Sequence, residues 1–195
     1  MTLIVAAKIV WAAGVIGWYL IRLPFERKVK RERVVDARDR MRELILLSCS
    51  TTGLGIIPLF WATSSLFDSY DYPYSVVQFV LGTALFIFAL WLFRRTHKDL
   101  GKNWSVTLEI KDSHKLITGG VYRYVRHPMY SAFFLWALAQ LVLVPNLIAG
   151  PSGLIGFGIL YAFRVGREEK MMLDTFGQEY RDYSARTARL LPGVY

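Results

Sequence analysis

The sequence predicts an all-α integral membrane protein with about five transmembrane helices. Of its 195 residues, 54% are apolar and 15% are aromatic, and several long runs carry no charge. The charged residues collect in the segments between those runs, whereas a soluble basic domain spreads them around a compact core. The same composition excludes a disordered chain. The single cysteine, Cys49, excludes an intrachain disulfide framework and a cysteine-cluster metal site.

Three apolar runs have the length of a membrane-crossing helix, which needs about 20 residues. The first, Leu3 to Leu23, is interrupted only by Lys8 and Arg22. It has neither an early basic region nor a small-residue cleavage site, so a cleaved signal peptide is not expected. The second and third runs, Leu44 to Phe67 and Tyr74 to Phe93, carry no formal charge.

A fourth uncharged run, Tyr130 to Phe163, is too long for one comfortable span. Pro145-Asn146 lies near its middle and is a turn signal, which favours a tight hairpin of two short helices. A single kinked helix is the alternative, because proline is tolerated inside membrane helices. Short arms predict helices that are buried among the others or that do not fully cross.

The basic residues outside these runs predict the orientation in the membrane. Lys and Arg number nine in Arg22 to Glu43, eight in Arg94 to Met129 and six in Arg164 to Tyr195, but none in Asp68 to Pro73 or at the Pro145 turn. Basic loops stay on the cytoplasmic side. The pattern therefore predicts five spans, an outside N-terminus, and a cytoplasmic C-terminus.

The segment from Arg22 to Glu43 mixes these basic residues with acidic ones. We expect a solvated helix that sets topology and touches anionic lipid headgroups. Mixed charge and few aromatic residues argue against a nucleic-acid partner. The acidic residues are Glu26, Glu32, Asp36, Asp39 and Glu43.

The segment before the fourth run contains several backbone signals. Gly101 is a helix stop signal after His97, and Gly119-Gly120 permits a positive φ or a close backbone approach. His127-Pro128 marks a helix start, because proline suits the first turn and excludes its predecessor from the helix. The positive end of that helix would lie beside Arg126 and His127, which predicts an anion site. Alternatively, Arg126 contacts lipid phosphates and His127 only caps the helix.

Arg164 and Glu168 follow the last apolar run and share one face of a continuing helix. A local ion pair is the simplest interpretation, but the order is the less favourable one for helix stability. Charged residues with weak structural purpose at a membrane boundary are functional candidates. Beyond them an apolar stripe predicts an amphipathic helix broken at Gly177. The stripe consists of Leu173, Phe176, Tyr180 and Tyr183.

Several familiar sites are not predicted. The glycine pairs at Gly53-Leu54-Gly55 and Gly156-Phe157-Gly158 lie in apolar spans and not in strand-to-helix turns, so they do not indicate a dinucleotide-binding loop. The three histidines lack metal-ligand spacing, so no metal site is expected. The serines in the spans have no nucleophile-elbow context.

An ordered set of motifs resembles the isoprenylcysteine carboxyl methyltransferase family, in particular its small prokaryotic members. The resemblance covers roughly the last 100 residues, and Arg-His-Pro-x-Tyr alone is also found in phospholipid methyltransferases and sterol reductases. The motifs are His114, Leu116, Gly120-Val121-Tyr122, Arg126-His127-Pro128-x-Tyr130, Arg164, Glu168-Glu169 and Phe176-Gly177-x-Glu179-Tyr180.

The resemblance implies a single membrane methyltransferase domain, with three helices in residues 1–93 and a catalytic region in residues 94–195. It implies a cytoplasmic pocket for S-adenosylmethionine, made by the segment before the fourth helix and the C-terminal helix. Arg164 would face the acceptor and Glu168 would close the site. The residues implied in cofactor contact are His114, Leu116, Gly120, Tyr122, His127, Tyr130 and Glu168.

The expected acceptor is a lipophilic or prenylated carboxylate that reaches the site from the membrane lipids. Arg164 could orient a carboxylate through two hydrogen bonds and would repel a charged amine. A phospholipid or amine N-methyltransferase is the alternative enzyme. A non-catalytic membrane protein that retains the fold is the alternative of another class.

Overall fold

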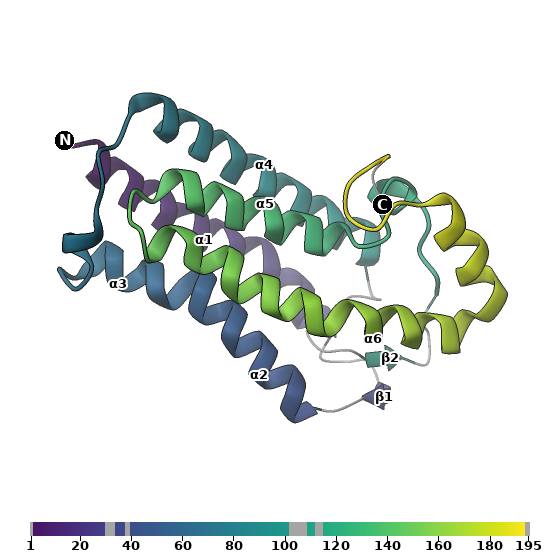
Figure 1. The fold of residues 1–195 in the computed structure, drawn as a ribbon. Helices are drawn as coiled ribbons and strands as arrows, with labels where there is room; N and C mark the ends of the chain where they lie inside the picture. Colours follow the sequence, from purple (N-terminus) through teal and green to yellow (C-terminus); the bar gives the residue numbers. More distant parts are fainter. Residues whose placement is uncertain (1, 30–33, 38–39, 102–108, 112–114, 194–195) are drawn as a thin grey trace.

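The computed structural model describes residues 2–29, 34–37, 40–101, 109–111 and 115–193. Long helices dominate it and pack side by side (Figure 1). In chain order the elements are α1 (Leu3–Val29), β1 (Val34–Ala37), α2 (Arg40–Thr51), the π-helix η1 (Thr52–Ile56), α3 (Ile57–Thr63), the short 3₁₀ helix η2 (Asp68–Tyr70), α4 (Val76–Leu100), β2 (Glu109–Lys111), η4 (Gly120–Arg123), α5 (Pro128–Leu143) and α6 (Ala149–Arg186).

The predicted class, an all-α integral membrane protein, is confirmed. Three helical stretches are long and apolar enough to cross a membrane: Leu3–Arg27, Met41–Thr63 and Val76–Leu100. Pro128–Leu143 is a shorter apolar helix, so the number of five spans stays a prediction. In addition to the helices, β1 and β2 form a two-stranded antiparallel ladder that pairs Val34 with Lys111.

The second membrane helix has an irregular middle, which the uncharged run Leu44 to Phe67 did not predict. It changes from α2 through η1 to α3 and ends at Thr63. In η1 the Gly53 carbonyl accepts hydrogen bonds from Gln140 Nε2 (3.1 Å) and Ser152 Oγ (2.7 Å). A π-helical turn of this kind often marks a functional site.

Glycine allows α6 and η1 to cross at backbone contact. A Cβ at Gly53 would lie 2.2 Å from the Ser152 carbonyl oxygen, and one at Gly156 would lie 2.5 Å from that of Cys49. Lipid is as apolar as leucine, so the hydrophobic effect does not hold membrane helices together and close packing supplies much of their association. Small residues at the interface allow this close approach. The crossing fixes α2 and η1 against α6, where the cavity described below lies.

The predicted hairpin is present, and the single kinked helix is wrong. α5 ends at Leu143, and α6 begins at Ala149 after the Pro145-Asn146 turn. The buried Asn146 side chain accepts from the Ala149 amide (2.9 Å) and donates to Asp71 Oδ1 (2.7 Å). It therefore links the hairpin to the loop before α4. It also satisfies backbone groups of the buried turn that would otherwise need a water molecule as hydrogen-bond partner.

Three predicted boundary signals are confirmed. α4 ends at Leu100 with Gly101 at φ 56°, and α5 begins at Pro128. α6 is interrupted at Gly177, which has φ 52° and ψ −120°, a conformation that residues with a Cβ rarely adopt. The chain then turns back, so that the Tyr183 hydroxyl donates to the Tyr122 carbonyl (2.6 Å). The last part of α6 therefore covers the segment before α5.

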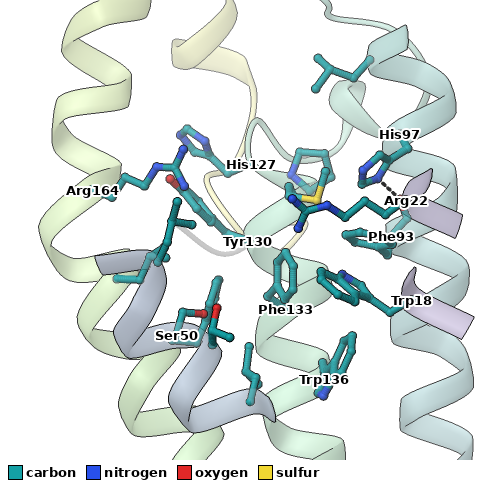
Figure 2. Close-up of a pocket in the computed structure, with 18 of the residues that line it drawn as sticks. Trp18, Arg22, Ser50, Phe93, His97, His127, Tyr130, Phe133, Trp136 and Arg164 are labelled. Atoms are coloured by element: carbon teal, nitrogen blue, oxygen red, sulfur yellow. Dashed lines mark hydrogen bonds between the residues drawn. The ribbon is translucent and has the colours of Figure 1, made fainter. Parts of the chain in front are cut away.

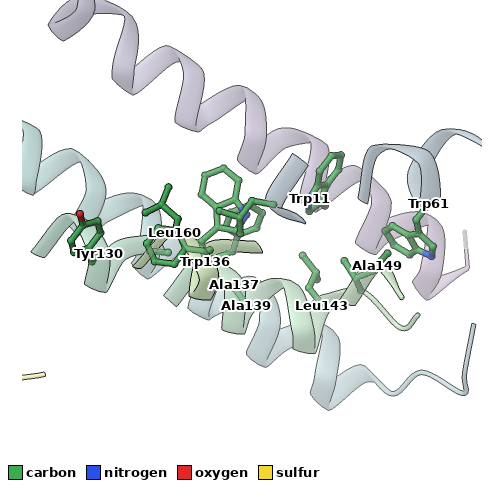
Figure 3. Close-up of a cluster of buried hydrophobic side chains, with 14 of the residues drawn as sticks. Trp11, Trp61, Tyr130, Trp136, Ala137, Ala139, Leu143, Ala149 and Leu160 are labelled. Carbon is green, nitrogen blue, oxygen red and sulfur yellow. The ribbon is translucent and has the colours of Figure 1, made fainter. Parts of the chain in front are cut away.

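The two ends of the helix bundle differ. Figure 1 shows the N-terminus and the α5–α6 turn at one end, and the strands and the C-terminus at the other. The hydrophobic core lies between these ends and includes Trp11, Phe86, Trp136 and Phe157, four rings from four helices. Figure 3 shows Trp11 and Trp136 among its labelled members. The polar residues singled out in the sequence gather beyond that core, toward the C-terminal end.

Candidate functional site

A cavity lies among α1, the α2–η1 helix, α4, α5 and α6. Its wall combines titratable and hydroxyl groups with aromatic rings, and Figure 2 shows Arg164, His127 and Tyr130 on one side and Arg22 and His97 on the other. Its polar lining comes chiefly from Arg22, Ser50, Thr51, His97, Tyr122, Arg126, His127, Tyr130, Arg164 and Glu168. Its apolar lining includes Val15, Trp18, Leu47, Leu54, Phe93, Phe133, Trp136, Phe157 and Leu160.

His127 is placed by the start of α5. It is the N-cap residue, but its side chain makes no capping hydrogen bond, so the interpretation of His127 as a simple cap is wrong. It is 6% exposed, with Nδ1 3.7 Å from Glu168 Oε1 and Nε2 3.1 Å from Glu169 Oε1. Burial alone would lower the pKa of His127, but hydrogen bonding to the two carboxylates outweighs it and raises that pKa.

Glu168 reaches the cavity from α6, opposite the start of α5. Its Oε2 accepts a short hydrogen bond from the Tyr130 hydroxyl. Burial alone would raise the pKa of Glu168, but His127, Arg164 and Tyr130 together lower it to about 2. The carboxylate is therefore ionised at neutral pH and can accept hydrogen bonds from an ammonium or a ribose hydroxyl.

Glu169 joins the start of α5 to the C-terminal segment. Its Oε1 accepts from Arg126 Nε (2.7 Å), and its Oε2 accepts from Arg189 Nη2 (2.8 Å). Burial alone would raise the pKa of Glu169, but His127, Arg126 and Arg189 lower it to about 2. Arg126 also donates to the Thr187 carbonyl, so its guanidinium is bound within the protein, which argues against the alternative of a contact with lipid phosphates.

Tyr122 enters the cavity from the 3₁₀ turn η4. The predicted positive φ is found at Gly120 (63°), where a Cβ would lie 2.1 Å from Asp99 Oδ2. The same Asp99 oxygen accepts from the Val121 amide (2.9 Å). Gly120 therefore lets the turn close onto α4, which places Tyr122 beside the cavity.

Arg164 lines the cavity from α6 and is 9% exposed. Its Nε lies 3.2 Å from Oε2 of Glu43, a residue of α2 that is 4% exposed. Arg164 therefore also pairs with a carboxylate of another helix, which the interpretation as a local ion pair with Glu168 did not include. The expectation that the acidic residues of Arg22 to Glu43 are solvated is wrong for Glu43, because the beginning of α2 packs on α6.

Aromatic rings form the apolar part of the cavity. Trp18 from α1 meets Phe93 of α4 and Trp136 of α5, with centroids 6.2 and 6.0 Å apart. Phe133 of α5 lies between Trp136 and Phe157, with centroids 6.2 and 5.3 Å away. This part suits the hydrocarbon portion of an amphipathic ligand, since few polar groups there would lose water on binding.

The structure brings together most of the predicted site residues. Tyr122, His127, Tyr130, Arg164 and Glu168 line one cavity, and Gly120 supports the turn that carries Tyr122. Leu116 is partly buried but does not line the cavity, and His114 lies outside the described residues. Sequence reasoning missed Glu43, Trp18 and Arg22 in the first two helices. Among the described residues, no group of three His, Cys, Asp or Glu side chains is placed to hold a metal ion.

The contribution of His127 to stability is expected to depend on pH. Its pKa is raised above the ordinary value of 6.5, so its stabilising effect is complete below about pH 6.5 and is lost as pH rises through the raised pKa. The two glutamates behave oppositely: their stabilising effect is complete above about pH 4.5 and is lost as pH falls toward 2. His127→Gln should therefore lower the melting temperature of detergent-solubilised protein by several degrees more at pH 6 than at pH 9.

The control for this experiment is Glu179→Gln, an exposed carboxylate on the same helix as Glu168. It should shift the melting temperature equally at both pH values. A destabilisation by His127→Gln that is the same at pH 6 and pH 9 would show that the histidine is not ionised in the folded protein.

The fold and the cavity define a multi-pass helical membrane protein with one partly polar, partly aromatic site at its C-terminal end. A model of the isoprenylcysteine carboxyl methyltransferase (ICMT) family matches residues 80–174. That region, slightly less than half of the chain, is similar to the isoprenylcysteine carboxyl methyltransferase family, in agreement with the resemblance found in the sequence.

Individual relatives agree with this assignment. The chain is 34% identical over 101 residues to the protein-S-isoprenylcysteine O-methyltransferase of Dictyostelium discoideum, which covers 49% of this chain and 41% of that protein. It is 32% identical over 117 residues to the enzyme of the same name from Homo sapiens, which covers 59% of this chain and 41% of that protein. The aligned part is therefore less than half of either relative.

A solved structure shares the fold. The eukaryotic intramembrane Ras methyltransferase ICMT superposes with a TM-score of 0.55 at 23% sequence identity. The match covers 80% of this chain and 54% of that one. It covers more of the chain than residues 80–195, so part of the chain before residue 80 also belongs to the shared fold.

Proposed function

We propose that the chain is a membrane methyltransferase that uses S-adenosylmethionine to methylate the carboxylate of a lipophilic acceptor. The observation that carries this proposal is the cavity itself. Arg164, Glu168, His127 and Tyr130 form its polar part, and aromatic rings of α1, α4, α5 and α6 continue directly from it. The relatives are named for a reaction on isoprenylcysteine, a carboxylate attached to a hydrocarbon chain.

The residues of the polar part fit S-adenosylmethionine. Glu168 is ionised and can accept from an ammonium or ribose hydroxyl, while Tyr122 and Tyr130 offer aromatic faces to a sulfonium. His127 lies at the positive end of α5, which suits a carboxylate. When bound, the cofactor supplies an electrophilic methyl group. Leu116 and His114 remain proposed contacts from the family resemblance.

Arg164 explains why a carboxylate is the favoured acceptor. A carboxylate is already a nucleophile at neutral pH, so the site needs no general base and can act by holding the reactants aligned and away from water. The guanidinium of Arg164 can hold the acceptor through charge-assisted hydrogen bonds. A charged amine would be repelled there, which argues against a phospholipid or amine N-methyltransferase.

The orientation in the membrane follows from the basic segments. We place the N-terminus outside and the polar part of the cavity, with the C-terminus, on the cytoplasmic side, where S-adenosylmethionine is available. Residues 94–195 supply Tyr122, His127, Arg164 and Glu168, and α1 and α2 complete the apolar wall. A prenyl chain would lie against that apolar wall. The side chains of the wall would then decide which acceptor is bound.

Isothermal titration with S-adenosylhomocysteine tests the proposal directly. Detergent-purified wild type should bind it saturably, and His127→Ala should weaken binding at least about tenfold by removing the group that pairs with both glutamates. The titration should be followed by radiolabelled methyl transfer to N-acetyl-S-farnesylcysteine. Absence of binding by folded wild type in both detergent and nanodiscs would favour a non-catalytic membrane protein that retains the fold.

A further inference from the structure

Two adjacent residues at the start of α2 dock onto two adjacent residues of α6. Arg42 Nη2 donates to the Phe163 carbonyl (3.2 Å), and the Glu43 carboxylate lies 3.2 Å from Arg164 Nε. The two contacts differ in their surroundings. Glu43 and Arg164 are 4% and 9% exposed, whereas Arg42 lies nearer the surface. The second contact is therefore a buried ion pair at the edge of the membrane region.

Stability alone gives a weak reason for such a pair. The cost of removing two charges from water largely cancels their attraction, and apolar residues of similar volume often stabilise a core as well or better. The neighbouring α6–η1 crossing already holds the two helices together through glycine contacts. A buried ionisable group beside a membrane helix is more often part of a functional site.

The geometry separates the roles of the two residues. Arg164 lines the cavity, whereas Glu43 does not, so the carboxylate contacts the guanidinium from behind. Figure 2 shows Arg164 extending from α6 toward His127 and Tyr130. A guanidinium is planar, and its hydrogen-bond directions are fixed by that plane. Arg164 Nε and Glu43 Oε2 lie 3.2 Å apart as an ion pair and not as a hydrogen bond, so the carboxylate acts by charge attraction and favours the orientation that keeps the guanidinium against it.

We propose that Glu43 is a positioning residue that aims the Arg164 guanidinium at the carboxylate of the acceptor. This inference rests on the proposed function, since it assigns the orientation of the residue that receives the acceptor. It places a determinant of acceptor binding on α2, outside residues 80–174 that match the family model. The acceptor site is then assembled from two parts of the chain that are 121 residues apart.

The test compares Glu43→Gln with wild type, using N-acetyl-S-farnesylcysteine as acceptor and its neutral amide as a competitive inhibitor. Glutamine keeps the size of the side chain and removes the charge. The variant should raise the KM for the carboxylate at least about tenfold, because the guanidinium is no longer aimed at it. The inhibition constant of the amide and the Kd of S-adenosylhomocysteine should stay within about twofold. Glu43→Asp should recover part of the loss.

Arg42→Gln is the matched control, because it removes the neighbouring α2–α6 contact without touching the cavity lining. Its KM should equal that of wild type. An unchanged KM in Glu43→Gln would overturn the inference and leave the proposed function standing, and so would equal weakening of carboxylate, amide and S-adenosylhomocysteine, which indicates a structural role. A wild type that binds neither S-adenosylhomocysteine nor acceptor would overturn the proposed function and this inference together.

Discussion

Arg164→Lys should lower kcat/KM for a carboxylate acceptor at least about 100-fold, equivalent to about 3 kcal/mol. Lysine keeps the positive charge beside the buried Glu43, so the variant avoids an unpaired buried carboxylate. An ammonium is a point charge that cannot present two parallel hydrogen bonds, so the orientation of the acceptor is lost. The Kd of S-adenosylhomocysteine, measured by titration, should stay within about threefold.

Arg167→Lys is the control for this substitution, because Arg167 is exposed on the same helix and does not line the cavity. Its kcat/KM should match that of wild type. Retention of full activity in Arg164→Lys would show that only the charge matters. If Arg164→Ala methylates an amine acceptor better than wild type does, the variant has lost the preference for carboxylates that Arg164 provides.

The signals that the sequence predicts correctly are local ones. Pro128 marks the start of α5 because proline has no amide hydrogen to donate and a fixed φ angle. Gly101 marks the end of α4, and Gly177 breaks α6, because glycine adopts a positive φ angle. The Pro145-Asn146 turn follows from an apolar run that is too long for one helix. Such features need no knowledge of distant contacts, so periodicity and composition are sufficient.

The contacts that the sequence does not predict join distant segments. Glu43 lies among basic residues at the edge of an apolar run, which is typical of a solvated residue, yet the α6–η1 crossing buries it against Arg164. In the sequence Trp18 belongs to an ordinary apolar span, although in the structure it lines the cavity. The roles of Glu43 and Trp18 depend on which faces of the helices meet. A uniformly uncharged run does not indicate which of its residues face the protein and which face the lipid.

Within the site, the sequence motifs predict which residues take part, but they do not predict which partners those residues contact. Glu169 was part of the recognised Glu168-Glu169 pair, but only the fold shows that it joins Arg126, His127 and Arg189. Arg189 belongs to the segment after α6, and its return to the start of α5 depends on the break at Gly177. Helical spacing relates Arg164 to Glu168, but it does not relate Arg164 to Glu43, which lies on another helix.

The α6–η1 crossing should be highly sensitive to added volume. Gly156→Ala is expected to destabilise the protein by about 3 kcal/mol, the upper end of the range of about 1–3 kcal/mol that overpacking typically costs. The added Cβ would lie 2.5 Å from the Cys49 carbonyl oxygen and 3.2 Å from the Gly53 Cα. Both are backbone atoms, so relief requires that the helices move apart and no rotamer change is sufficient.

Gly158→Ala supplies the matched comparison, since it lies two residues further along the same helix and its Cβ would meet nothing within 4 Å. Alanine there should be neutral or stabilise the helix by about 0.5–1 kcal/mol. Thermal unfolding of both variants in the same detergent measures the difference. Because η1 carries Leu54 and Gly55 of the cavity wall, Gly156→Ala should also weaken acceptor binding in the fraction that folds. Equal melting temperatures for the two variants would contradict the close crossing of α6 and η1.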